Sequence, residues 1–191
     1  ILDIPLKFKK AFSVKSDVSS VYVKNCLITG HNLCLKKKIK GMINCPINKK
    51  NVFRNNNYGV TEFLALKNKV NKSEVMIIYN KKLSVVPITT HIRIKNISNI
   101  LKKDLLIKKI KTLNKCYFKY FKKKPRVAVL GLNPHNSEFK KNSEEIKIII
   151  PAIKDLKKKI NISGPYPSDT IFIKENLKKF DVIVGMYHDQ V

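Results

Sequence analysis

The sequence predicts an α/β fold built on a mostly parallel sheet. Two apolar, β-branched runs, residues 127–130 and 180–186, have the length and composition of buried strands. Between them, residues 143–160 carry apolar side chains at the spacing of one helix face. A strand, a helix and a second strand in this order form the βαβ unit from which parallel sheets are built.

The first third of the chain has a weaker pattern. Residues 15–39 show little periodicity, and residues 39–45 are expected to form a short strand that ends at a proline. The Asn-rich residues 51–58 are expected to form a loop. Residues 61–66 then begin a helix with an acidic first turn.

The middle of the chain predicts a hairpin and two helices. Residues 75–79 and 85–88 are β-rich runs separated by the polar residues 80–82, as in a hairpin. Residues 97–121 carry a broken helical period, which predicts two helices joined near Asp104.

The helix over residues 143–160 has recognisable start and break signals. Asn142 is the expected N-cap, with Glu145 three residues later in a capping-box-like arrangement. Pro151 is expected to kink or break the helix, because it lacks a backbone N–H. Residues 164–170 are expected to form a rigid, proline-rich loop.

The ends of the chain and its hydropathy indicate whether it is a piece of a longer protein and whether it enters a membrane. The chain begins at Ile1 and stops at Val191, directly after a predicted strand and a polar loop, so we expect an internal piece of a longer protein. No apolar run approaches the roughly 20 residues that a membrane span needs. The first residues lack the layout of a signal peptide, so no membrane partner and a cytoplasmic location are expected.

The charge is strongly basic, with 40 Lys and Arg against 13 Asp and Glu and a net charge of +27. Only Arg54, Arg93 and Arg126 are arginines, whereas proteins that recognise nucleic acid rely on the bidentate arginine fork. The lysines are scattered, and the abundance of Lys, Ile and Asn is typical of AT-rich codon usage. We therefore expect no nucleic-acid partner; a basic nucleic-acid-binding module stays open as the non-enzyme alternative.

Three histidines follow predicted strands, each inside a polar turn: His91, His135 and His188. In open α/β sheets, ligands bind at the carboxyl ends of the strands, where distant residues converge. Imidazole is the commonest protein ligand for a catalytic divalent metal. One such histidine alone more often caps a loop, but the conjunction of three favours a metal site.

Two carboxylates accompany these histidines. Asp189 directly follows His188, and Asp169 lies in the proline-rich loop. Each could take a proton from a metal-bound alcohol or orient a histidine, and each could equally be a turn or helix N-cap residue. The sequence contains neither a G-x-G-x-x-G nor a Walker phosphate loop.

Several short segments, taken in chain order, carry a resemblance to a known family. They are residues 46–49, 61–65, 89–91, 131–135, 144–146 with 150–151, 164–170 and 186–190. In these segments the chain resembles the 4-hydroxythreonine-4-phosphate dehydrogenases of vitamin B6 biosynthesis. The resemblance runs from about residue 41 to the end and leaves residues 1–40 as a poorly matched N-terminal remnant.

The resemblance implies a three-layer α/β/α fold like that of the isocitrate and isopropylmalate dehydrogenases, here incomplete at both ends. Residues 41–191 would form a catalytic α/β region that contributes to a two-domain cleft at a homodimer interface. The cofactor would be NAD or NADP, bound without a Rossmann fingerprint and by residues that we do not assign. A divalent metal, zinc, cobalt or magnesium, would be held by His91, His135 and His188 drawn from both subunits.

The implied reaction is the NAD-dependent oxidation of 4-phosphooxy-L-threonine, followed by decarboxylation to 3-amino-2-oxopropyl phosphate. Thr61 matches the family's substrate contact, and Asp169 and Asp189 are the candidates for proton handling or orientation.

The chain departs from the family pattern at two places. Val60 stands where the family has a substrate-binding histidine, and residues 136–141 replace a glycine-rich turn, which is expected to stiffen or re-route that loop. The chain also ends before the family's downstream segment. Two alternatives follow: a dehydrogenase of a related phosphorylated four-carbon sugar acid, or an inactive truncated relic.

Overall fold

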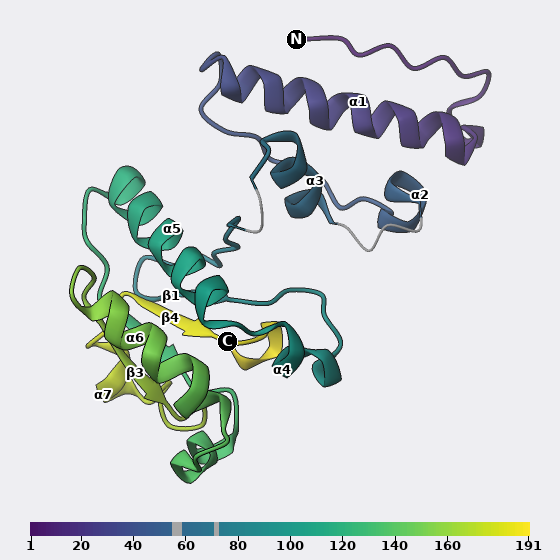
Figure 1. Cartoon of the computed structure of the whole chain (residues 1–191). Helices are drawn as coiled ribbons and strands as arrows, with labels where there is room; N and C mark the ends of the chain where they lie inside the picture. The colour runs from purple at the N-terminus through teal and green to yellow at the C-terminus, as the bar shows by residue number, and fades with distance from the viewer. Residues whose placement is uncertain (55–58, 71–72) are drawn as a thin grey trace. The chain divides into compact units, whose positions relative to one another are not determined.

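The computed structural model describes residues 1–54, 59–70 and 73–191 (Figure 1). The chain divides into two compact units, Ile1–Lys69 and Val70–Val191. The division at residue 40, which rests on the family resemblance, remains a prediction about where the catalytic region begins.

The first unit is helical. Its elements are a 3₁₀ turn at Ala11–Ser13, α1 at Ser16–Leu35, α2 at Lys49–Phe53 and α3 at Val60–Lys67. Leu27 of α1 is buried against Val52 and Phe53, and the Ser20 hydroxyl donates to the Asn51 carbonyl oxygen at 3.0 Å. A small apolar cluster and this hydrogen bond therefore join α1 to α2.

Two expectations for this unit are wrong. Residues 39–45 form no strand: Ile39 and Ile43 are exposed, and a strand needs a neighbouring ladder for its backbone groups. Residues 51–53 of the expected loop belong to α2, while residues 55–58 lie outside the described part of the chain. The helix expected from residue 61 is confirmed as α3, and the Glu62 carboxylate accepts the Gly59 N–H at 2.8 Å.

The second unit is built on a parallel sheet. Within the described residues its strands are β1 (Ser84–Pro87), β2 (Val127–Leu130), β3 (Ile162–Tyr166) and β4 (Val182–Gly185), in the order β1-β4-β2-β3. All three pairings between these strands are parallel, which confirms the expected sheet type. The predicted hairpin is reduced to one antiparallel bridge between Ile78 and Val85.

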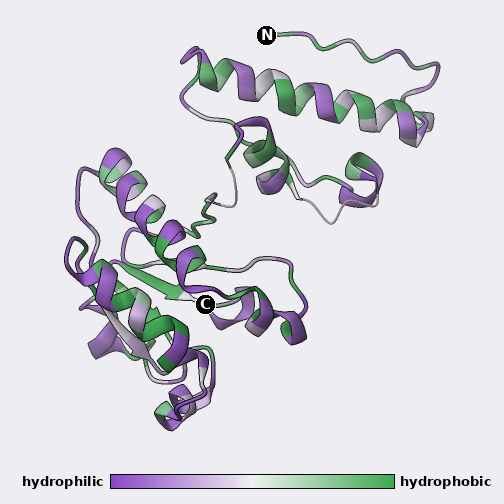
Figure 2. Ribbon diagram, in the orientation of Figure 1, coloured by the Kyte–Doolittle hydropathy of each residue, from purple (hydrophilic) through white to green (hydrophobic). Residues whose placement is uncertain are grey.

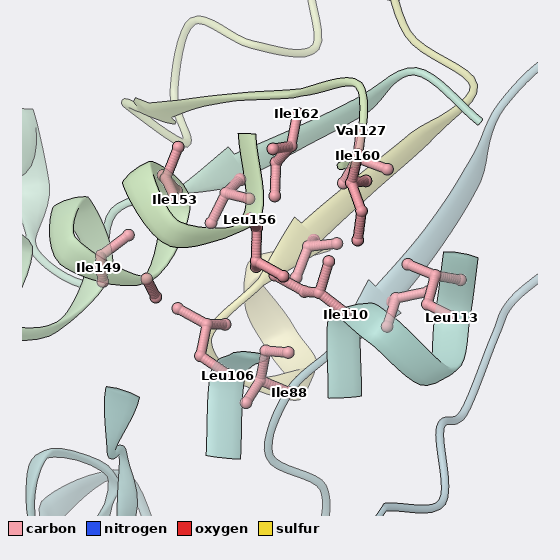
Figure 3. Packing of buried hydrophobic residues seen from close by; sticks show 14 of the residues in the cluster. Ile88, Leu106, Ile110, Leu113, Val127, Ile149, Ile153, Leu156, Ile160 and Ile162 are labelled. Carbon is pink, nitrogen blue, oxygen red and sulfur yellow. The ribbon is translucent and has the colours of Figure 1, made fainter. Parts of the chain in front are cut away.

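Helices cover both faces of the sheet, as expected for an α/β/α arrangement. One cluster joins Val129 and Val184 to the helices α5 (Lys103–Phe121) and α6 (Ile150–Lys157). Figure 3 shows Leu106 and Ile110 of α5 in this cluster with Leu156 of α6. The opposite face buries Ala128 and Ile183 against a layer that includes α7 (Lys174–Leu177). Along α5 and α6, hydrophobic and hydrophilic residues alternate in bands, which is the pattern of helices with one buried face (Figure 2).

The predicted break within residues 97–121 is confirmed. Helix α4 spans Ile97–Ile100, and α5 begins at Lys103 with Asp104 in its first turn.

The helix predicted over residues 143–160 begins with a π-helical turn at Glu145–Ile149 and continues as α6. The expected cap at Asn142 is wrong, because the Ser143 hydroxyl accepts the Ile146 N–H at 3.4 Å. The wide turn lies just before Pro151, which cannot donate a helical hydrogen bond.

Two elements lack a clear sequence signal. Helix α1 carries apolar residues on more than one side, so its pattern shows little amphipathic period. The proline-rich segment predicts a loop over residues 164–170, whereas Gly164 and Pro165 belong to β3 at the sheet edge, where proline is tolerated. Among the described residues, no helix combines the length and apolar character needed to cross a membrane.

Candidate active site

The histidine-bearing turns lie at one end of the sheet, where the carboxyl ends of the strands meet. Because the strands are parallel, their carboxyl ends lie at the same edge. His91 follows β1, His188 follows β4 and His135 follows β2, and these three strands are neighbours in the order β1-β4-β2. Asp169 follows β3, the next strand along.

The structure brings the predicted side chains together in pairs. The rings of His91 and His188 have centroids 6.3 Å apart. His188 Nδ1 lies 3.0 Å from an Asp189 carboxylate oxygen, and His135 Nδ1 lies 3.8 Å from one of Asp169. The His135 and His188 side chains are 75% and 46% exposed, so both imidazoles are open to a ligand.

Buried hydrogen bonds hold the histidine turns to one another. The Thr89 hydroxyl donates to the Met186 carbonyl oxygen at 2.7 Å, which joins the turn after β1 to the turn after β4. The Gln190 side chain donates to the Gly131 carbonyl oxygen at 2.6 Å and accepts the Met186 N–H at 2.7 Å. Thr89 and Gln190 therefore connect all three histidine turns, although neither is a predicted site residue.

The turn after β2 is packed too tightly for a side chain at its first position. A Cβ on Gly131 would overlap the Asn136 side-chain oxygen. Asn136 is only 2% exposed, and its amide donates to the Pro165 carbonyl oxygen at 3.2 Å. This contact joins the His135 turn to β3.

The segment His135–Phe139 is left-handed. All five residues have φ between +48° and +56°, and none is glycine. Glycine adopts this region at little cost, whereas other L-residues are destabilised there. The backbone next to His135 is therefore strained over five consecutive non-glycine residues.

Two adjacent glutamates face the start of that turn. Glu145 is fully buried, and its carboxylate accepts the N–H groups of Leu132 at 2.8 Å and Asn133 at 2.9 Å. Glu144 accepts the Asn133 side-chain amide at 2.9 Å. Burial alone would raise the pKa of Glu144, but hydrogen bonds led by that from Asn133 outweigh it and hold the pKa below its ordinary value. The capping-box role expected for Glu145 is wrong.

Thr61 lies on the first unit and is described there by itself. It is exposed on the first turn of α3, next to Val60, which packs against the cluster of Leu27 and Phe53. Within the second unit, the structure groups His91, His135, His188, Asp169 and Asp189 at the carboxyl ends of the strands.

Within the described ranges, no group of three or more His, Cys, Asp or Glu side chains is arranged to hold a metal ion. Among these residues, one chain brings the imidazoles of His91 and His188 near each other, and His135 lies beside Asp169. This fits the resemblance, which draws the metal's ligands from both subunits, because each chain then needs to supply only part of the set. Exposed imidazoles are suitable donors for zinc or cobalt.

Known proteins with similar sequences and structures point to one family. The family described as pyridoxal phosphate biosynthetic protein PdxA matches residues 1–191, including the first forty residues. The 4-hydroxythreonine-4-phosphate dehydrogenase of Aquifex aeolicus is 41% identical over 162 residues, which cover 82% of this chain and 49% of that protein. The D-threonate 4-phosphate dehydrogenase of Pectobacterium atrosepticum is 30% identical over 203 residues, covering 100% of this chain and 60% of that protein.

The fold agrees with these similarities. The crystal structure of 4-hydroxythreonine-4-phosphate dehydrogenase from Klebsiella pneumoniae superposes with a TM-score of 0.81 and 30% identity, covering 93% of this chain and 55% of that one. The chain spans about half the length of the first curated relatives it matches. Because the family match extends over the whole of it, the chain belongs to the family of the pyridoxal phosphate biosynthetic protein PdxA.

Proposed function

We propose that the chain is part of a metal-assisted, nicotinamide-dependent dehydrogenase that oxidises and decarboxylates 4-phosphooxy-L-threonine in pyridoxal 5'-phosphate biosynthesis. One observation carries the proposal: in a chain of this family, three histidine turns follow neighbouring parallel strands and are tied together by Thr89 and Gln190. That arrangement supports a site where imidazoles from separate segments face one ligand.

His91, His135 and His188 would hold the divalent metal: zinc, cobalt or magnesium. When bound, the metal would act as a Lewis acid on the substrate alcohol, and NAD or NADP would accept the hydride. Asp189 lies within hydrogen-bond distance of His188 Nδ1, at 3.0 Å, and can accept its N–H, which would leave Nε2 free for the metal. Asp169 lies 3.8 Å from His135 Nδ1 and would need to move closer to accept its N–H. In this role the two carboxylates orient the imidazoles. The alcohol proton would pass to one of them as the carbonyl forms.

A homodimer is part of the proposal. Among the described residues of one chain, the rings of His91 and His188 lie near each other and His135 lies beside Asp169, so a second copy would complete the ligand set. Thr61 would contact the substrate. We also place the enzyme in the cytoplasm and give nucleic acid no role.

A second candidate function is dehydrogenation of a phosphorylated four-carbon sugar acid. Val60 packs with apolar neighbours where the resemblance expects a substrate-binding imidazole, and one relative is named a D-threonate 4-phosphate dehydrogenase. The two candidates are separated by an assay in which the enzyme is given NAD and each substrate in turn, and the formation of reduced nicotinamide is measured. Turnover of neither substrate would favour the inactive relic.

The metal site is tested by calorimetric titration of the chain with zinc and cobalt. We expect saturable binding that His91→Ala, His135→Ala or His188→Ala abolishes. His31→Gln is the control, because His31 is buried in α1 and is not one of the proposed ligands, so the substitution should leave the binding unchanged. If the wild-type chain binds metal no better than the three alanine variants, the proposal is wrong for this chain.

A further inference from the structure

A buried carboxylate supports the segment that leads to His135. Glu145 begins the π-helical turn and is 0% exposed. One of its oxygens accepts the backbone N–H groups of Leu132 at 2.8 Å and Asn133 at 2.9 Å. The Asn133 side-chain amide approaches both oxygens, at 3.3 and 3.1 Å. A single carboxylate thus accepts hydrogen bonds from two consecutive residues.

The Glu145 contacts matter for His135 because the two backbone donors lie just before it in the chain. Leu132 and Asn133 follow β2 and precede Pro134 and His135. Their N–H groups lie past the last residue of β2, so the strand ladder does not supply their acceptors. Pro134 fixes its own φ, so the backbone direction at Asn133 largely determines where His135 begins.

Other contacts hold the residue before this pair. The Gly131 N–H donates to the Tyr166 carbonyl oxygen at 2.9 Å, and its carbonyl oxygen accepts from Gln190. The strand side of the turn is therefore fixed by neighbouring strands, and Glu145 holds the next two residues from the helix side. Hydrogen bonds to a charged group are shorter and stronger than neutral ones, which suits this role.

We propose that Glu145 is a positioning residue: it sets the course of the chain from β2 to His135 and thereby the place of the His135 imidazole beside Asp169. The importance of that imidazole for a metal rests on the proposed function. The anchoring itself rests on the contacts of Glu145.

The variant Glu145→Gln keeps the size of the side chain but replaces one acceptor oxygen with an NH₂ group. That group meets the Asn133 amide, so two donors face each other. The matched control is Glu144→Gln, because Glu144 is partly exposed and bonds the Asn133 side chain without touching either backbone N–H.

The test uses NMR on the metal-free chain. In Glu145→Gln the remaining side-chain oxygen is an uncharged, weaker acceptor for the N–H groups of Leu132 and Asn133. We therefore expect amide exchange at these two residues to accelerate by about tenfold. We also expect the His135 ring resonances to move. The control should change neither. Unchanged exchange, or faster exchange with unchanged His135 resonances, would overturn the inference.

Cobalt titration of the same proteins separates this inference from the proposed function. If the wild-type chain binds cobalt, Glu145→Gln should weaken binding by about tenfold to a hundredfold, as residues that orient metal ligands do. If the wild-type chain binds none, the metal proposal fails, and the NMR result still decides the role of Glu145. If Glu145→Gln does not fold, Asn133→Ala removes donors to the same carboxylate and should also shift the His135 resonances; unshifted resonances would refute the inference.

Discussion

The left-handed turn after β2 predicts that one glycine substitution stabilises the protein. Glu138 lies in this turn with φ of +48°. Its side chain is 78% exposed and makes an ion pair with Lys140 at 4.0 Å. An exposed pair at that distance adds little stability, so the backbone conformation dominates the effect of substitution.

The size of the effect follows from two opposing terms. A non-glycine residue in the left-handed region is destabilised by about 1–2 kcal/mol, which Glu138→Gly would relieve. Glycine also gives the unfolded chain more freedom, which opposes the gain by about 0.4–1 kcal/mol. The expected net gain is about 0.5–1 kcal/mol, or about 1–4 °C in Tm for a chain of this length.

The assay is urea and thermal unfolding followed by far-UV circular dichroism. Glu138→Ala is the matched control, since it removes the same carboxylate but keeps the Cβ that makes the left-handed region unfavourable. We expect the glycine variant to be more stable than both the wild type and the alanine variant. A glycine variant no more stable than the alanine variant would refute the argument from backbone strain.

Two other substitutions test packing and charge. Gly131→Ala should lower the unfolding free energy by about 1–3 kcal/mol, because its methyl group overlaps the buried Asn136 side chain. Gly41→Ala, which meets nothing within 4 Å, should not; equal urea midpoints for the two variants would contradict this. Burial raises the pKa of Asp181, but hydrogen bonds led by those from Arg126 outweigh it and lower the pKa to about 2. Asp181→Asn should therefore cost about 1–2 kcal/mol at neutral pH, after allowance for solvent screening. A depressed folded-state pKa stabilises the protein above the unfolded value of about 4, so this cost should fade as pH falls from about 4 to 2. A difference that stayed constant in urea unfolding across that range would count against it.

Local sequence patterns predicted the central strands, but they failed where pairing with a neighbouring strand decides whether a segment is a strand or a loop. The β-branched run over residues 127–130 forms β2 as expected, because four consecutive apolar residues suit a strand buried on both faces. Residues 39–45 also carry apolar side chains, interrupted by Lys40, Gly41 and Asn44, but they pair with no strand among the described residues and remain a loop. In β3, Gly164 and Pro165 indicate a turn, yet they lie within the strand, between Ser163 and Tyr166, which pair with β2.

The same distinction applies to the candidate site. The histidines could be found from the sequence because each follows its own strand, and that is a local feature. The contacts of Thr89 and Gln190 join residues that are 97 and 59 positions away in the chain, so no spacing rule indicates them. Glu145 gives a local signal for a helix cap, but the capping hydrogen bond comes from Ser143 instead.

The sequence by itself determined the α/β class, the parallel strands β2 and β4 and the three strand-end histidines, because periodicity and turn residues act over a few neighbouring positions. Only the tertiary structure decided the strand order β1-β4-β2-β3, which makes the three histidine turns neighbours. It also decided that the buried Glu145 carboxylate binds the turn before His135. Strand order and the partner of a buried charge depend on contacts between distant segments, which form only when the sheet and its helices pack together.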